Sequence, residues 1–141
     1  LSLYTAYVDL EGKKVSPFSD NMKDEFGEFG ILILNRQEFF QRVYKALAKN
    51  NFVKKSYMGF VEYLPEEKQE GLMDWHPFIK KDCFAYQNEF RITFVSDNSE
   101  PVMLNLDCSL RDIAVPINAD DLHEIHFEGE NLLYPVYKQE D

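Results

Sequence analysis

The sequence has little cysteine: only Cys83 and Cys108 occur among its 141 residues. Two thiols cannot form the disulfide framework that holds many small secreted domains together. Cys108 lies in a run typical of a strand, so we expect both cysteines to be free, reduced thiols in the core. This use of cysteine predicts a cytoplasmic protein.

Long hydrophobic runs are also missing. No apolar stretch approaches the roughly 20 residues that a membrane-spanning helix needs, and no basic segment followed by an apolar one opens the chain. The chain begins at Leu1 and not at Met, which is typical of a processed protein or of a piece of a longer one. Its length predicts a single domain over residues 1–141.

Several kinds of site lack their usual residues. The sequence contains no glycine-rich phosphate loop, and its basic residues are scattered rather than clustered with aromatics, so direct nucleic-acid binding is not expected. His123 and His126 are three residues apart on a predicted strand, where they would face opposite sides. His76 has no neighbours at a known ligand spacing, and we expect no metal site.

Negative charge is abundant and unevenly placed. The formal net charge is −10, and residues 97–141 carry 11 acidic side chains against Arg111 and Lys138. Such a region repels phosphate backbones and attracts a basic partner, although a solvated acidic face that only maintains solubility explains it as well. The candidate binding residues for a basic protein are Asp112, Asp120, Asp121, Glu124, Glu128 and Glu130.

The clearest predicted element is a helix over residues 36–49. Asn35 and Glu38 have the spacing of a capping box, and a stripe of apolar residues from Phe39 to Leu47 recurs at helical spacing. Asn50-Asn51 could end the helix in the left-handed conformation. A shorter helix, capped by Ser19, is predicted to reach Phe26.

The rest of the chain reads mostly as strands. We predict an α+β fold with a single mixed or mainly antiparallel sheet and the 36–49 helix packed on one face. Ile31 to Leu34 is wholly apolar and predicts a buried central strand, Gly59 indicates a bulge, and Pro116 indicates an edge strand. The predicted strands are 1–10, 31–34, 52–63, 90–96, 102–106, 113–117, 122–127 and 132–137, with 90–96 and 102–106 forming a hairpin.

The most informative stretch runs from Lys80 to Val95. Its second half alternates apolar and polar residues as a half-buried strand does, and the triplet Gln87-Asn88-Glu89 lies just before it. With Tyr86 ahead of it, this triplet resembles the Gln-x-Glu motif of one clade of mono-ADP-ribosyltransferases. The resemblance implies an NAD-using enzyme in which Glu89 is the catalytic carboxylate, assisted by Gln87 and Tyr86.

A structural role for Glu89 is the alternative. A carboxylate at the start of a strand can form ion pairs with nearby bases, and Lys80, Lys81 and Arg91 are the candidates. In that case the triplet has no catalytic meaning, and the cofactor-binding residues implied by the resemblance are unknown.

A second resemblance covers most of residues 30–117. A Lys, followed by Phe-x-Tyr-x-x-Glu-Phe-Arg, resembles the signature of an uncharacterised family found in bacteria and phages; the matching residues are Phe39, Val61, Tyr63, Lys80, Phe84, Tyr86, Glu89, Phe90 and Arg91. It implies a microbial origin and no particular activity. The leading functional hypothesis is therefore an acidic interaction domain that binds a basic protein, in the manner of a nucleic-acid mimic, with the transferase as the alternative.

Overall fold

The structure is a computed structural model that describes residues 1–6, 8–9, 14–15, 19–68, 76–97, 103–128 and 131–133. It confirms the α+β class, with helices and mainly antiparallel strands. The chain divides into two compact units, one built from residues 1–5 and 35–112 and the other from residues 6–34 and 113–141. Among the described residues, none of the helices combines the length and the apolar character required to span a bilayer.

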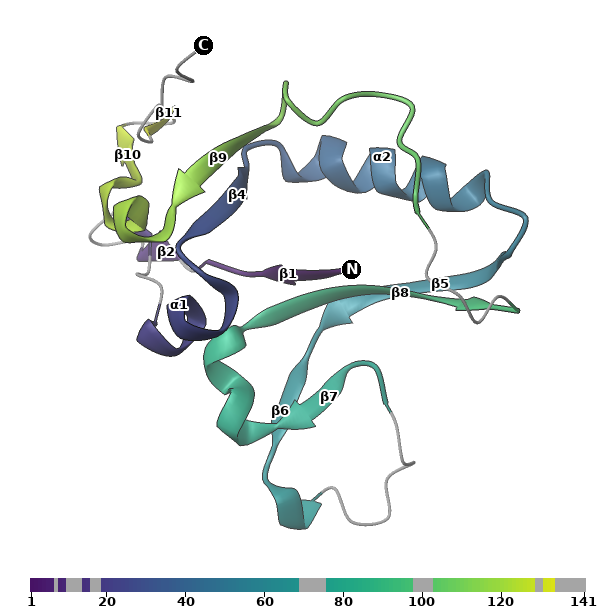
Figure 1. The fold of residues 1–141 in the computed structure, drawn as a ribbon, viewed down its shortest axis with the longest axis horizontal. Coiled ribbons are helices and arrows are strands. Elements are labelled where there is room, and N and C mark those ends of the chain that lie inside the picture. Colours follow the sequence, from purple (N-terminus) through teal and green to yellow (C-terminus); the bar gives the residue numbers. More distant parts are fainter. Residues whose placement is uncertain are drawn as a thin grey trace. The chain divides into compact units, whose positions relative to one another are not determined.

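The first unit is built on a three-stranded antiparallel sheet with the order β1-β8-β5 (Figure 1). These strands are β1 (Ser2–Tyr4), β5 (Val53–Phe60) and β8 (Glu89–Ser96). The alternating sequence predicts a strand here, and in the structure this strand, β8, is the central one of the three and pairs with β5 along most of its length. Because directly opposed residues share a face, Phe90, Leu3 and Phe60 lie on one side, and Glu89 and Arg91 lie on the other.

Helix α2 (Arg36–Ala48) confirms the predicted main helix. The Asn35 side chain accepts a hydrogen bond from the backbone amide of Glu38 at 3.0 Å, which satisfies one of the free amides of the first turn. The helix buries Phe39, Val43 and Leu47 of its apolar stripe and leaves Tyr44 exposed, and the Phe40 ring lies 5.3 Å from that of Phe90 in β8. Helix α2 thus packs on the apolar face of this sheet.

The helix does not end as the sequence suggested. Lys49 caps it in a right-handed conformation, and Asn50 does not take up a positive φ angle. Instead, the Asn50 side-chain amide donates to the carbonyl of Ala46 at 2.5 Å, which satisfies a carbonyl of the last turn. The Asn50 side chain therefore satisfies a carbonyl at the helix end, a role that was expected of an asparagine in the left-handed conformation.

A small parallel pair, β6 (Glu62–Leu64) and β7 (Ile79–Lys81), completes the first unit together with the 3₁₀ helices η1 (Glu66–Lys68) and η2 (Asp82–Gln87). The predicted bulge at Gly59 is absent from β5, where the register shifts at Val53/Lys55 instead. A Cβ at Gly59 would lie 3.7 Å from the Phe78 ring, which is an ordinary van der Waals contact, so the ring does not require glycine there.

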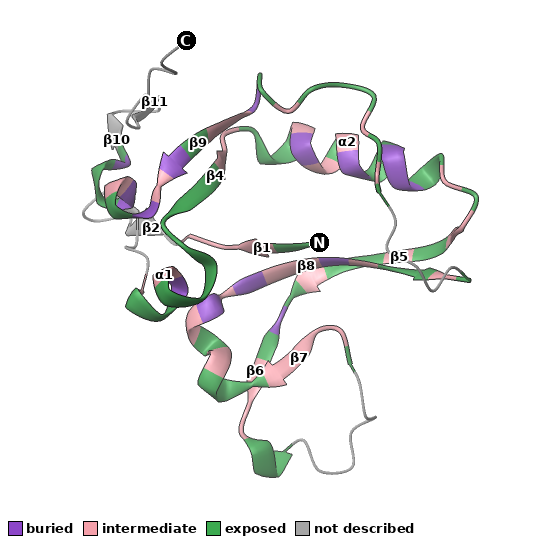
Figure 2. Ribbon diagram, viewed as in Figure 1, coloured by how far each residue is buried: buried purple, intermediate pink, exposed green. Residues whose placement is uncertain are grey.

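The second unit contains the antiparallel pair β4 (Phe29–Ile33) and β9 (Ala114–Asn118). Its core is formed by Ile117, Leu122 and Ile125, with Leu32 packed against them. The prediction of a fully buried strand at 31–34 is wrong, because within the described part of the chain β4 is paired on one side only and most of it is exposed (Figure 2). Sequence hydrophobicity located the strand but not its burial.

The remaining elements of the second unit are the capped helix α1 (Asp20–Phe26), the 3₁₀ helix η3 (Ala119–Glu124) and a four-stranded antiparallel sheet of order β11-β10-β3-β2. Its strands are β2 (Val8–Asp9), β3 (Lys14–Val15), β10 (His126–Glu128) and β11 (Asn131–Leu133). Ser19 caps α1 as predicted. The predicted strand 122–127 is shorter, because residues 122–124 belong to η3, and residues 134–137 lie outside the described part of the chain.

Three further expectations are corrected. Within the described residues the strands form four sheets and not one. Residues 103–106 form no strand, so the predicted hairpin with 90–96 does not form over those residues, and residue 102 is not described. Cys83 and Cys108 are both free but exposed, because one lies on η2 and the other in the irregular segment that follows residue 103.

Candidate functional site

The candidate site lies where η2 turns into β8. Asn88, between Gln87 and Glu89, adopts the left-handed conformation with φ 38° and ends η2. Its side chain and carbonyl both bond to the backbone of Thr5, the carbonyl accepting from the Thr5 amide at 2.9 Å. The backbone amide of Glu89 donates to the Tyr63 hydroxyl at 2.9 Å. The triplet is therefore fixed by its backbone as well as by its side chains.

Glu89 is the centre of a buried ionic network. Its side chain is held between two cations: Lys80 Nζ lies 2.6 Å from Oε1, and Arg91 Nε lies 2.7 Å from Oε2. Only 8% of Glu89 is exposed. Of the three bases that the sequence offered as partners, the structure brings Lys80 and Arg91 to Glu89, whereas Lys81 pairs with the exposed Glu66 at 2.5 Å.

Neighbouring groups hold the two cations in place. Lys80 also donates to the side-chain oxygen of Gln87, which is itself 4% exposed, and its ammonium lies 5.0 Å from the centre of the Phe84 ring. Arg91 donates to the Pro77 carbonyl at 2.8 Å. Among the described residues no buried side-chain polar atom lacks a hydrogen-bond partner. The network is therefore closed on itself.

The network fixes the ionisation of Glu89. Burial raises the pKa of the carboxyl, but hydrogen bonds from Arg91 and Lys80 outweigh this effect and lower its pKa from the usual 4.5 to about 2. Glu89 is thus ionised at neutral pH, and both of its oxygens are occupied by cations. Such a carboxylate is suited to holding η2, β7 and β8 together.

The three residues of the catalytic hypothesis are brought together only in part. Gln87 and Glu89 both contact Lys80, so their side chains meet on one side of the chain. Tyr86 is half-buried, and its hydroxyl lies 3.5 Å from the Gln87 side-chain nitrogen. The structure thus connects Gln87 and Glu89 through the ammonium of Lys80, which the sequence indicated as a possible partner of Glu89 but not of Gln87.

The acidic residues of the C-terminal third are a second candidate site, and several are paired with bases from the first half of the chain. Arg42 binds Asp112 with two hydrogen bonds of 2.7 and 2.6 Å, which hold the pKa of that carboxyl below its usual value. Three further pairs are Lys23 with Asp120, Lys49 with Asp107 and Lys54 with Asp97. Sequence analysis missed these bases, since the paired residues are 43 to 97 positions apart.

Arg42 has the most contacts of these bases. Its Nε also donates to the carboxylate of Glu38, four residues earlier on α2, at 2.8 Å, and its guanidinium donates to the Ser109 carbonyl. The spacing of Glu38 and Arg42 is the signal that sequence analysis could have used. Together these bonds anchor the segment around Asp112 to α2, so Asp112 is committed to the fold of the first unit.

Of the six predicted binding residues, Asp121 and Glu124 lie on η3 next to Asp120. The side chains of Glu128 and Glu130 lie outside the described residues.

His123 and His126 contact backbone carbonyls through Nδ1, at 2.5 and 2.7 Å. Within the described part of the chain no group of His, Cys, Asp and Glu side chains could hold a metal ion.

Comparisons of the chain with protein families, with curated proteins and with solved structures find no match. The structure defines an α+β protein with a buried ionic network at the start of β8, and the sequence has an excess of acidic over basic residues.

Proposed function

We propose that the protein is an acidic interaction domain of the cytoplasm that binds a basic protein surface in the manner of a nucleic-acid mimic. The observation that carries this proposal is the net charge of −10, most of it contributed by residues 97–141. Internal ion pairs neutralise acids locally but leave the net charge unchanged, so a basic partner is still attracted over a distance of about a Debye length, roughly 10 Å. The resemblance to a bacterial and phage family favours an origin in a mobile element.

Four of the predicted binding acids lie close together in the sequence. They are Asp121 and Glu124 on η3, and Glu128 and Glu130, which follow. Asp112 and Asp120 are held by Arg42 and Lys23, and using them would require breaking those pairs. A short acidic surface of this kind offers carboxylates where a nucleic acid would offer phosphates.

Replacing Asp121 with Asn and Glu124 with Gln tests this assignment. We expect the double variant to bind poly-L-lysine about fivefold more weakly than the wild type, because it loses two charges from the proposed surface. Binding of the wild type should also weaken steeply as salt is raised from about 0.05 M to about 0.3 M, where exposed charges are screened. Fluorescence anisotropy of labelled poly-L-lysine measures both effects.

The matched control is the double variant Glu62→Gln/Glu67→Gln, which removes two exposed charges from the first unit. It has the same net charge as the η3 variant, so a smaller loss of affinity assigns binding to the C-terminal acids. An equal loss in both variants would show that only overall charge matters. An affinity that is independent of ionic strength would remove the basis of the proposal.

The transferase remains the alternative, and the observation that bears on it is the convergence of Gln87 and Glu89 on Lys80. A carboxylate that binds a ribose hydroxyl must be free to accept a hydrogen bond, whereas Glu89 is enclosed by Lys80 and Arg91. We therefore expect no nicotinamide release when the protein is incubated with NAD, and no NAD-dependent rise in melting temperature. Nicotinamide release that Glu89→Gln abolishes would establish the transferase instead.

A further inference from the structure

The outer edge of β4 is an open edge whose hydrogen-bonding groups face outward. The Leu34 amide donates to the Ile113 carbonyl at 2.8 Å, and the Ala119 amide donates to the Glu28 carbonyl at 2.7 Å. In an antiparallel pair such bonded positions alternate with non-bonded ones. Gly30 and Leu32 therefore point their backbone groups toward β9, and the residues between and around them, Phe29, Ile31 and Ile33, point theirs away from it. Among the described residues nothing pairs with that edge.

Other edges among the described strands carry features that discourage pairing. In β9, Pro116 is opposite Ile31 at a non-bonded position, so its nitrogen, which has no hydrogen to donate, faces the outer edge of β9. Strand β5 has Lys54 and Lys55 and a shift in register on its edge. Strand β4 has the sequence Phe-Gly-Ile-Leu-Ile, with no charge, proline or bulge. It is thus better suited to accept a strand than β5 or β9.

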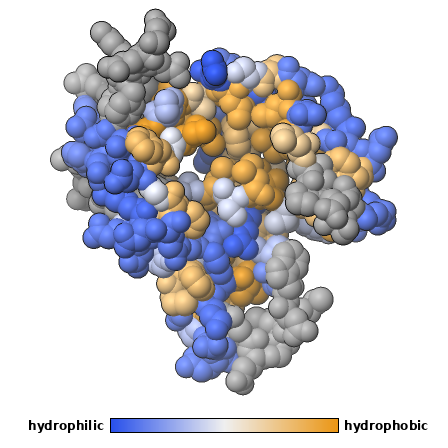
Figure 3. Space-filling model, in the orientation of Figure 1, coloured by the Kyte–Doolittle hydropathy of each residue, from blue (hydrophilic) through white to orange (hydrophobic). Residues whose placement is uncertain are grey.

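One face of β4 is apolar and exposed. Gly30 and Leu32 face the core of the second unit, since a Cβ on Gly30 would lie 3.8 Å from Ile117. Phe29 and Ile31 point to the opposite side and are 79% and 74% exposed. Figure 3 shows hydrophobic residues in the region of β4. An added strand would cover this face with every second side chain.

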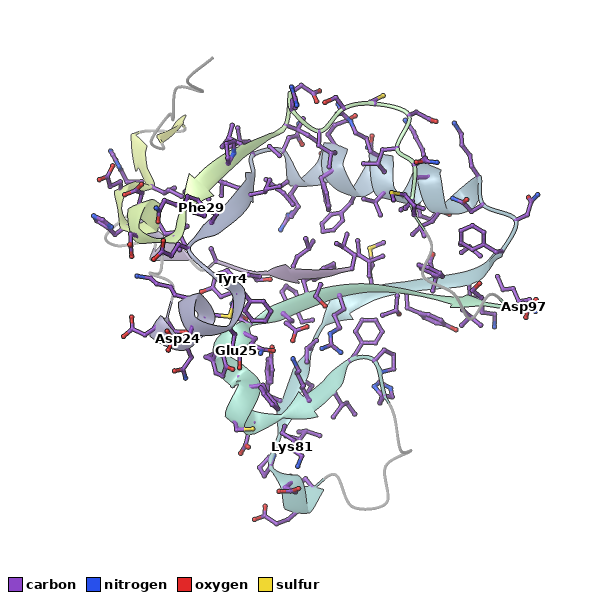
Figure 4. All side chains as sticks on the ribbon, in the orientation of Figure 1. Tyr4, Asp24, Glu25, Phe29, Lys81 and Asp97 are labelled. Atoms are coloured by element: carbon purple, nitrogen blue, oxygen red, sulfur yellow. The ribbon has the colours of Figure 1, made fainter. Side chains whose placement is uncertain are left out.

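The surroundings of this edge are acidic. Asp24 and Glu25 are exposed on α1, and Glu28 is exposed immediately before β4. Figure 4 labels Asp24 and Glu25 on α1 and Phe29 at the start of β4, and Figure 3 shows hydrophilic residues in the region of α1. A strand added here meets apolar side chains on one face and carboxylates at one end. Apolar side chains at every second position would cover the exposed face of β4, and basic side chains at the positions between them would supply the positive charge that the carboxylates attract. A segment that alternates apolar and basic residues combines both.

We propose that β4 binds an extended segment of a partner protein by strand addition, and that this segment alternates apolar and basic side chains. Main-chain hydrogen bonds to the outward-facing groups of Phe29, Ile31 and Ile33 supply affinity, and the exposed apolar face selects the alternate side chains. The proposal rests on the proposed function for the positive charge of the partner, and it adds the surface and the conformation of the bound segment.

A synthetic peptide of about eight residues, the length of a long strand, with valine and lysine in alternation is the probe. Hydrogen exchange measured by NMR on the full chain should show a periodic response. The peptide should protect the amides of Phe29, Ile31 and Ile33, which face outward, and should change those of Gly30 and Leu32 little, because these already bond to β9. Absence of any protection in β4 at saturating peptide would overturn the proposal.

A peptide of the same composition, with its valines and lysines in two blocks, separates strand addition from charge attraction. We expect it to bind about tenfold more weakly, because it cannot place apolar side chains on one face. Equal, salt-sensitive binding of both peptides, without protection in β4, would overturn strand addition and leave the proposed function standing. Protection by the alternating peptide at high salt would support strand addition even if the acidic surface were unimportant.

The variant Phe29→Ser/Ile31→Ser tests the apolar face. Both side chains are mostly exposed, so the fold should be retained while affinity for the alternating peptide falls about tenfold. Met103→Ser, at a residue that is 83% exposed in an irregular segment, is the matched control and should bind as the wild type does. Concentration-dependent dimerisation in light scattering that the double variant abolishes would assign the edge to a second copy of the chain and overturn the proposal.

Discussion

Replacing Glu89 with Ala should lower the free energy of unfolding by about 3 kcal/mol, because it leaves two cations in a largely buried place without their counterion. Lys80 and Arg91 converge on this carboxylate from β7 and β8, and Gln87 has its oxygen on the same ammonium. Both cations are partly exposed and can recover some hydration. The loss of unfolding free energy should therefore lie at the lower end of the range for a broken buried ion pair. Urea denaturation followed by circular dichroism measures the change.

The pair of Lys81 with Glu66 provides the control. It has the same chemistry and lies one residue along β7, but both of its members are exposed. Surface pairs contribute little because water solvates the separated charges almost as well, so Glu66→Ala should leave the unfolding midpoint nearly unchanged. A Glu89→Ala protein as stable as the Glu66→Ala protein would show that the network makes no net contribution to stability.

Acid should destabilise the protein through the same carboxyl. The folded-state pKa of Glu89 is about 2, below its usual 4.5, so the unfolded state takes up a proton first as the pH falls. The stability that Glu89 contributes is complete above about pH 5 and is lost between about pH 4.5 and pH 2. A shift of this size corresponds to roughly 3 kcal/mol at most.

Other acidic groups titrate in the same range, so the measurement is a difference between two proteins. Glu89→Gln has no charge to lose at this position, and its stability should fall less steeply with pH than that of the wild type. The gap between the two unfolding free energies should narrow as the pH approaches 2. If the unfolding free energies of the two proteins changed in parallel with pH, Glu89 would have an ordinary pKa in the folded protein.

The features that could be predicted from the sequence are local ones. The main helix follows from Asn35 as a cap and from apolar residues at helical spacing, signals that lie within one short segment. The alternation after Glu89 likewise predicted the strand β8, although not its central place in the sheet. The end of the helix was mispredicted, because a side-chain bond from Asn50 to Ala46 competes with the left-handed backbone that asparagine can also adopt.

Burial and strand pairing could not be predicted, because they depend on which segments meet. The apolar run at 31–34 is consistent with a central strand, yet among the residues that the structure describes β4 has a partner on one side only. In the sequence, the acids of the C-terminal third form one region of negative charge. Their ion-pair partners, such as Arg42 and Lys23, could not be recognised because they are far away in the sequence. For Glu89, the residue types near it predicted the ion pair, but only the fold selected Lys80 and Arg91 over Lys81.

Pro116 limits how the β4–β9 pair can grow. A fibre built by edge-to-edge pairing of strands needs two strand edges on every subunit, each able to pair with a neighbouring subunit. In this pair the outer edge of β9 lacks a backbone hydrogen-bond donor where Pro116 faces outward. Only the outer edge of β4 can therefore pair with another strand. A strand added to β4 therefore ends the series, and any association through these two strands stops at a finite complex and does not continue into a filament.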